Sequence, residues 1–143
     1  MFISEVKIKL ARGGDRDTLR AFCRIVINGE FAISDLKVIQ SPSGLFVAMP
    51  SKRVTVRCRQ CGEKVPVKVR FCWRCGIEEP VLETDIQIDE RGRQKLHTDI
   101  AHPIRRECRE AITRAVVAAY EAEVELAALP GYECRYGDYN GEE

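Results

Sequence analysis

Long apolar runs are missing from this sequence. No stretch approaches the roughly 20 consecutive apolar residues that a membrane helix requires. At 45% hydrophobic and 31% charged residues, the composition is typical of a soluble globular chain. Met1–Glu5 leads directly into a strand-like pattern, so we expect no signal peptide.

Motifs of catalysis are missing as well. The sequence has no Gly-rich phosphate loop, no nucleophile motif and no acid–base pair at a spacing typical of an active site. Of its two histidines, His102 precedes a proline and is expected to have a local structural role, and His97 carries no signal. We therefore expect a protein that is not an enzyme.

Cysteine, in contrast, is plentiful and patterned. Two Cys-x-x-Cys-Gly units, Cys58–Gly62 and Cys72–Gly76, could each aim two sulfurs at one point, because glycine tolerates the positive φ that closes such a turn. Zinc prefers four such ligands at tetrahedral corners. The sequence therefore predicts a structural zinc ribbon without an open coordination position, with the ligands Cys58, Cys61, Cys72 and Cys75.

Other uses of these cysteines stay open. Two disulfides, a redox-active Cys-x-x-Cys, or iron in the same cage are the alternatives. Seven cysteines is an odd number, which leaves Cys23, Cys108 and Cys134 as free thiols or small apolar residues. An odd count suits a reducing cytosol better than a secreted disulfide scaffold.

The net charge is only +1, but its distribution is uneven. Glu121–Glu143 contains seven acids against Arg135 alone, and Ser51–Cys75 contains eight cations against Glu63 alone. A basic module in a nearly neutral chain favours a localised polyanion-binding surface over an ordinary solvated one. The eight cations are Lys52, Arg53, Arg57, Arg59, Lys64, Lys68, Arg70 and Arg74.

Alternating apolar residues predict a small β-sheet in the first 50 residues. Asn28-Gly29 is a strong type I′ hairpin signal. In a regular strand, Phe31 and Ile33 would face the opposite side from Leu36 and Val38. We therefore expect a bulge near Asp35 that turns both pairs to the same side. A loop is expected at Arg12–Asp15 and a turn at Ser41–Gly44. The expected strands are Glu5–Leu10, Thr18–Ile27, the segment from Phe31 to Val38, and Leu45–Met49.

The remainder is predicted to hold the ribbon, a weak strand pair and a helix. Val65, Val67 and Val69 alternate as one hairpin arm of the ribbon. Leu82–Ile88 is a weaker strand prediction with Gln94–Thr98 as partner, across a turn at Asp89–Gly92. The only long helix is expected to have Pro103 in its first turn and to end at Pro130-Gly131. Its apolar stripe is Ile104, Cys108, Ala111, Ile112, Ala115, Val116, Ala119 and Tyr120.

Two longer motifs carry a resemblance to a known family. Gly44–Arg53 (Gly-Leu-Phe-Val-Ala-Met-Pro-Ser-Lys-Arg) and Asp99–Ile104 (Asp-Ile-Ala-His-Pro-Ile) resemble the SpoVG (stage V sporulation protein G) family, with support from Val6–Leu10, the Asn28–Phe31 hairpin and Ile33–Ile39. The resemblance covers about residues 3–53 and 82–122. It implies an α+β fold, an antiparallel sheet followed by a C-terminal helix. It also implies a bacterial, cytoplasmic, usually dimeric regulator that binds RNA and DNA.

The sequence departs from the family pattern in one large way. Family members usually have a short loop where this chain carries the cysteine module. We therefore predict a discontinuous SpoVG-like domain (1–53 and 82–130), a ribbon insertion (54–81) and an acidic tail (131–143). It stays open whether the ribbon extends the nucleic-acid surface, replaces it or binds a protein.

Candidate nucleic-acid contacts lie in both modules. Lys52 and Arg53 could position phosphates. Trp73 could stack on an unpaired base or pack on the ribbon hairpin against Val67. The resemblance favours phosphate contacts over a solvated face for the helix arginines, and the two basic groups could form one continuous surface. The helix set is Arg105, Arg106, Arg109 and Arg114.

Two hypotheses follow. The first is a non-enzymatic, homodimeric regulator that binds nucleic acid by phosphate attraction, with a structural zinc ribbon that extends its basic surface. The alternative is a protein-interaction adaptor whose ribbon docks a partner protein, the basic charge being incidental. We expect neither a membrane nor a small-molecule substrate as partner.

Overall fold

A computed structural model describes residues 1–12 and 18–137. The chain divides into two compact units, which are described separately below. The sheet unit comprises Met1–Pro50 and Ala101–Glu143, and the cysteine unit comprises Ser51–Ile100. This division groups residues 82–100 with the cysteines, whereas the sequence placed them in the sheet domain. Of the predicted loop at Arg12–Asp15, residues 13–15 lie outside the described part.

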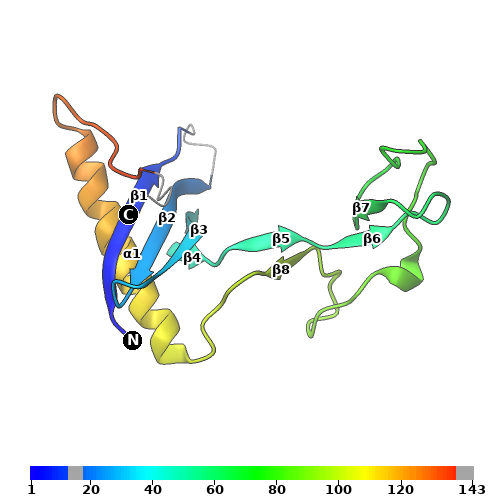
Figure 1. Cartoon of the computed structure of the whole chain (residues 1–143), viewed down its shortest axis with the longest axis horizontal. Coiled ribbons are helices and arrows are strands. Elements are labelled where there is room, and N and C mark those ends of the chain that lie inside the picture. Colours follow the sequence, from blue (N-terminus) through cyan, green and yellow to red (C-terminus); the bar gives the residue numbers. More distant parts are fainter. Residues whose placement is uncertain (13–17, 138–143) are drawn as a thin grey trace. The chain divides into compact units, whose positions relative to one another are not determined.

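The sheet unit contains a four-stranded antiparallel sheet and one C-terminal helix, which confirms the predicted α+β class. The strands follow one another in the order β1-β2-β3-β4, so each strand pairs with its neighbours along the chain (Figure 1). Side chains alternate between the two faces of such a sheet, and one face buries the apolar set. The strands are β1 (Ile3–Leu10), β2 (Leu19–Ile27), β3 (Phe31–Ser41) and β4 (Gly44–Ala48).

Two local irregularities of this sheet were predicted correctly. Asn28 and Gly29 have φ of 54° and 67° in the turn between β2 and β3, as a type I′ turn requires. Asp35 has φ of 64°, and the β2–β3 register shifts there, because Cys23 pairs with Leu36 whereas Ile25 pairs with Ile33. The bulge turns the apolar residues of β3 on both sides of Asp35 to the same face.

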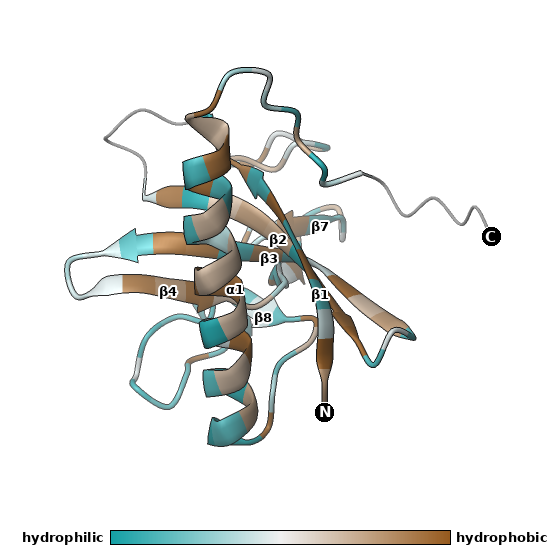
Figure 2. Cartoon of the chain, turned by 90° about the vertical axis from the view of Figure 1, so that its left-hand side faces the viewer, coloured by the Kyte–Doolittle hydropathy of each residue, from teal (hydrophilic) through white to brown (hydrophobic). Residues whose placement is uncertain are grey.

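Helix α1 (Arg106–Ala127) lies across one face of the sheet (Figure 2). Ile112 and Val116 of the predicted apolar stripe are buried against the sheet residues. The prediction of Pro103 in the first helical turn is wrong, because Arg105 is still extended at φ −116°, ψ 144°. Ile104 is 89% exposed, so no apolar burial favours an earlier start. In the described part of the chain, no helix is long and apolar enough to cross a membrane.

The cysteine unit contains two short antiparallel strand pairs. β5 (Ser51–Arg53) pairs with β8 (His97–Asp99), and β6 (Thr55–Arg57) pairs with β7 (Lys64–Pro66). The valine arm predicted from Val65 to Val69 is shorter than expected, because β7 ends at Pro66, which has no N–H for the ladder. Val65 and Val67 are nevertheless buried in the small core of this unit.

The strand predicted at Leu82–Ile88 is wrong. The structure has a 3-10 turn at Glu83–Asp85 and a single bridge between Ile88 and Gln94. Leu82 and Ile88 are 47% and 66% exposed, so they form no apolar face that would stabilise a strand. The return segment near Gln94–Thr98 pairs through β8 with β5 instead. The predicted turn at Asp89–Gly92 is present, and the Gly92 N–H donates to the Asp89 carbonyl at 3.0 Å.

Candidate metal centre and its basic surroundings

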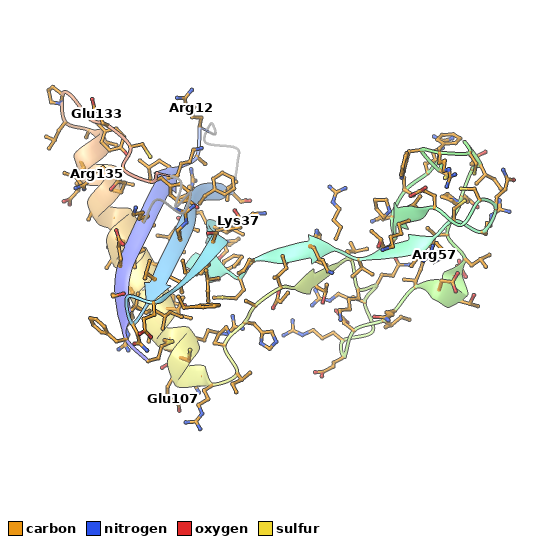
Figure 3. All side chains as sticks on the ribbon, in the orientation of Figure 1. Arg12, Lys37, Arg57, Glu107, Glu133 and Arg135 are labelled. Atoms are coloured by element: carbon orange, nitrogen blue, oxygen red, sulfur yellow. The ribbon has the colours of Figure 1, made fainter. Side chains whose placement is uncertain are left out.

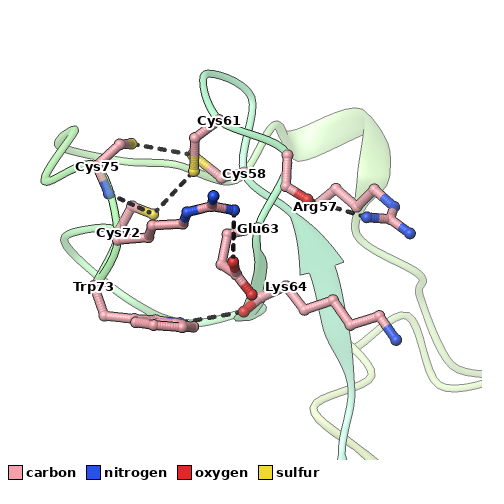
Figure 4. Close-up of polar contacts among 10 residues, drawn as sticks. Arg57, Cys58, Cys61, Glu63, Lys64, Cys72, Trp73 and Cys75 are labelled. Atoms are coloured by element: carbon pink, nitrogen blue, oxygen red, sulfur yellow. Dashed lines mark hydrogen bonds and ion pairs between the residues drawn. The ribbon is translucent and has the colours of Figure 1, made fainter.

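The two cysteine knuckles have the same backbone geometry. The N–H of Gly62 donates to the Cys58 carbonyl at 3.0 Å, and the N–H of Gly76 donates to the Cys72 carbonyl at 2.9 Å. Both glycines have positive φ, 77° and 75°, a conformation that a side chain disfavours. The spacing of each Cys-x-x-Cys-Gly unit thus produces one closed turn, and each turn presents two sulfurs (Figure 4).

The four sulfurs gather at one point. The Sγ atoms of Cys58 and Cys75 lie 3.7 Å apart, those of Cys61 and Cys72 lie 3.6 Å apart, and all four lie within 4.8 Å of one another. A tetrahedral site with metal–sulfur bonds of about 2.3 Å has edges of about 3.8 Å. All seven cysteines are free thiols in the structure. The donor set therefore fits a tetrahedral metal ion and not a pair of disulfides, whose sulfurs would lie about 2 Å apart.

Backbone N–H groups favour negative charge in this cluster. The N–H of Cys61 lowers the pKa of the Cys58 thiol to about 6, and the N–H of Cys75 lowers the pKa of Cys72. The N–H of Glu63 acts in the same direction on Cys61, but burial and the neighbouring cysteine side chains outweigh it and raise that pKa to about 11. Two of the four sulfurs, one in each knuckle, are thus favoured as thiolates, the form that binds a metal ion.

Three residues predicted to bind nucleic acid hold the two knuckles together. Arg59 donates to the carbonyls of Glu78 and Glu79 at 3.0 and 2.9 Å. Arg74 forms a 3.0 Å ion pair with Glu63. The ring N–H of Trp73 donates to the carbonyl of Lys64 at 3.2 Å, yet the side chain is 70% exposed. Trp73 is therefore anchored at its edge, and much of its surface remains open to solvent.

The structure exposes every residue that was predicted to contact nucleic acid. Among these residues, Arg57 donates to the Gly62 carbonyl at 3.1 Å, Arg70 lies 3.6 Å from Glu78, and Arg106 lies 2.9 Å from Glu110. The other cations have no hydrogen bond or ion pair through their side chains within residues 1–12 and 18–137. These seven, called the unpaired cations below, are Lys52, Arg53, Lys64, Lys68, Arg105, Arg109 and Arg114.

One aromatic residue of the knuckles was missed from the sequence. Phe71 precedes Cys72 and is 50% exposed, and the Arg70 guanidinium lies 5.4 Å from the centre of its ring. The available signal was its position, since Phe71 and Trp73 flank the same cysteine. The second knuckle therefore exposes two aromatic side chains and not one.

Fold and centre together define a class of protein. The chain is an α+β protein, a four-stranded antiparallel sheet with one helix, that carries a two-knuckle, four-cysteine centre in a separate unit. The family model described as SpoVG matches residues 1–122. The chain belongs to the SpoVG family, and the resemblance seen in its two motifs is confirmed.

Relatives of known name agree with this assignment. The chain is 29% identical over 148 residues to "Putative septation protein SpoVG" of Bdellovibrio bacteriovorus, with 100% of this chain and 99% of that protein covered. It is 33% identical over 127 residues to "Putative septation protein SpoVG 1" of Listeria monocytogenes serotype 4b, with 89% and 85% covered. It is 31% identical over 126 residues to "Putative septation protein SpoVG" of Shouchella clausii, with 88% of this chain and 90% of that protein covered. None of these names is that of an enzyme.

Proposed function

We propose that this chain is a non-enzymatic, nucleic-acid-binding regulatory protein of the bacterial cytoplasm. The observation that carries the proposal is the set of seven unpaired cations, all of which are exposed. An exposed Lys or Arg without an acidic neighbour is available to neutralise a phosphate and release its counterion. Such contacts position a nucleic acid without reading its sequence, so the proposal is general affinity for RNA or DNA.

The metal ion in this proposal is a structural zinc. Cys58, Cys61, Cys72 and Cys75 would hold it, and four thiolates leave no coordination position for water or substrate. The small core around Val65 could not maintain the cysteine unit alone, so metal binding would supply much of its folding free energy. The zinc would thus fix the cations of the knuckles in place, and it would have no chemical step to perform.

The test removes unpaired cations and leaves the knuckle contacts intact. Lys52→Gln/Lys64→Gln/Lys68→Gln is suitable, whereas substitution of Arg57, Arg59 or Arg74 would also remove contacts within the ribbon. The triple variant is expected to bind single-stranded RNA and duplex DNA more weakly by a similar factor for all sequences, because phosphates carry no sequence information.

A matched control is available in the same unit. Arg93 is exposed but already lies 3.7 Å from Asp89, so Arg93→Gln should leave binding nearly unchanged. Zinc content of each variant shows that the cysteine unit is folded. Parent-like affinity of the folded triple variant for both nucleic acids would place the binding surface elsewhere.

Exposed apolar side chains favour the second candidate function, a protein-interaction adaptor. Phe71, Trp73, Leu82 and Ile88 of the cysteine unit are 50%, 70%, 47% and 66% exposed. Exposed apolar groups of this kind occur at protein-binding sites. A docking surface of that type would bind its partner with little dependence on salt, whereas phosphate binding weakens steeply as salt increases.

A further inference from the structure

The sheet of the first unit has a second face, which α1 does not cover. The buried residues Ile8, Cys23 and Leu36 pair across β1, β2 and β3 on the helix side. Their neighbours along each strand therefore point to the opposite side, which we call the open face. The fold thus leaves one face of the sheet outside the helix–sheet core.

A cation, an aromatic ring and a second cation lie in one row on the open face. Lys9 pairs with Phe22, and Phe22 pairs with Lys37, which is labelled in Figure 3. Directly opposed residues of antiparallel strands have Cβ atoms about 5 Å apart, so the half-buried Phe22 side chain is flanked by a lysine on each neighbouring strand. Phe46 of β4 lies on the same face and is 44% exposed. Lys9 and Lys37 are exposed as well.

The neighbouring row shows what chemistry this face accepts. Lys7 pairs with Arg24, which is only 8% exposed and donates to Ser34 Oγ at 3.0 Å. The segment after α1 reaches the same guanidinium, because Arg24 donates to the Gly137 carbonyl at 2.7 Å and lies 4.8 Å from the centre of the Tyr136 ring. An aromatic ring and an oxygen acceptor thus lie side by side on this row, as a base and a phosphate oxygen would.

Charge argues against a second copy of the chain on this face. The cations of the two rows are Lys7, Lys9, Arg24 and Lys37. Glu5 of β1 lies on the same face, and its carboxylate is 3.9 Å from the Lys7 ammonium. A two-fold interface would place this patch against itself, so like charges would meet. A polyanion with aromatic groups has the complementary charge and shape.

We infer that the open face is a binding platform for single-stranded nucleic acid. Unpaired bases would stack on Phe22 and Phe46, and Lys9 and Lys37 would contact the flanking phosphates. A duplex would not suit the platform, because its bases are already stacked on one another. This inference rests on the proposed function, but none of its residues is one of the seven unpaired cations.

The experiment separates base stacking from phosphate attraction. The affinity of the full chain is measured for a twelve-nucleotide oligothymidine and for an abasic strand with the same number of phosphates. Stacking contributes roughly 1–3 kcal/mol per base, so two stacked bases should make the parent prefer the thymidine strand by about thirtyfold or more. Phe22→Leu keeps an apolar side chain without a ring, and the loss of one stacked base should lower this preference by about fivefold or more.

Phe31→Leu is the matched control. Phe31 is a 64% exposed phenylalanine of the same sheet, but it pairs with Ile27, which packs on the helix side. The control should keep the full preference of the parent, and light scattering should show the same mass for parent and both variants.

The possible outcomes separate this inference from the proposed function. A fall of about fivefold or more in the preference in Phe22→Leu but not in Phe31→Leu supports the platform. An equal preference in parent and Phe22→Leu, or a parent without any preference, overturns it, while binding that still depends on Lys52, Lys64 and Lys68 keeps the proposed function. A change of assembly state in Phe22→Leu also overturns it, because the face would then be an interface between copies. Failure of the parent to bind either strand overturns both.

Discussion

Individual residues of the knuckles build both the four-cysteine cluster and the surface around it. Each glycine closes a turn, and each cysteine supplies one sulfur. Side chains inside each Cys-x-x-Cys unit contact residues next to the other knuckle. Arg59 and Trp73 show why side-chain roles were hard to predict: the sequence identifies an exposed cation or ring, but their carbonyl partners near Glu78 and Lys64 depend on how the turns meet.

Removal of one sulfur tests the metal centre. Cys72→Ser is expected to lose bound zinc and the structure of the cysteine unit, because the remaining three thiolates no longer complete the tetrahedron. Elemental analysis gives the zinc content, and circular dichroism at 222 nm should retain the signal of α1 from the other unit. Cys134→Ser is the matched control, since Cys134 is an exposed thiol outside the cluster. Zinc at one equivalent in Cys72→Ser, or no zinc in the parent, would contradict the assignment.

A second residue-scale prediction concerns the bulge. Asp35 has a left-handed backbone, which costs a β-branched residue roughly 1–2 kcal/mol and costs glycine little. Asp35→Val should therefore lower the free energy of unfolding by about that amount, and Asp35→Gly should be close to neutral. Urea denaturation of the sheet unit measures both. Equal stability of the two variants would show that the left-handed conformation is not needed there.

The elements of the sheet unit were largely predictable, whereas those of the cysteine unit were less so. Strand alternation, the Asn28-Gly29 turn and the bulge are local signals, and the sheet core reinforces each of them. In the cysteine unit the two knuckles and their contacts, and not an apolar face, organise the chain, so apolar patterning at Leu82–Ile88 gave the wrong element. The beginning of α1 was also misplaced, because proline near a helix start does not fix which residue begins it.

Helix packing on the sheet can be tested with two isoleucines. Ile112 of α1 is 3% exposed in the core, whereas Ile104 precedes the helix and is 89% exposed. Ile112→Ala should reduce the free energy of unfolding by about 2–5 kcal/mol through lost burial and a cavity. Ile104→Ala should change it by less than about 0.5 kcal/mol. Denaturation followed by the helical signal distinguishes them, and similar losses would refute the described packing of α1.

At the scale of the whole molecule, the sheet unit is expected to form a homodimer. Strands β1 and β4 are the outer strands of the four-stranded sheet, and an exposed strand edge can pair with another copy. Light scattering should give twice the monomer mass of 16.2 kDa at micromolar concentration. A mass of one chain under these conditions would show that the edges are not used for assembly.

The central claim is that the exposed cations bind nucleic-acid phosphates, and salt dependence tests it most directly. The dissociation constant of the zinc-loaded parent for one single-stranded RNA is measured from 50 to 200 mM salt. Each phosphate contact contributes a slope of about −0.7, so contacts by the four unpaired cations of the cysteine unit alone predict a slope of about −3 and a loss of affinity of about 50-fold. A slope near zero, or no binding at 50 mM salt, would contradict the account and favour a protein-interaction adaptor.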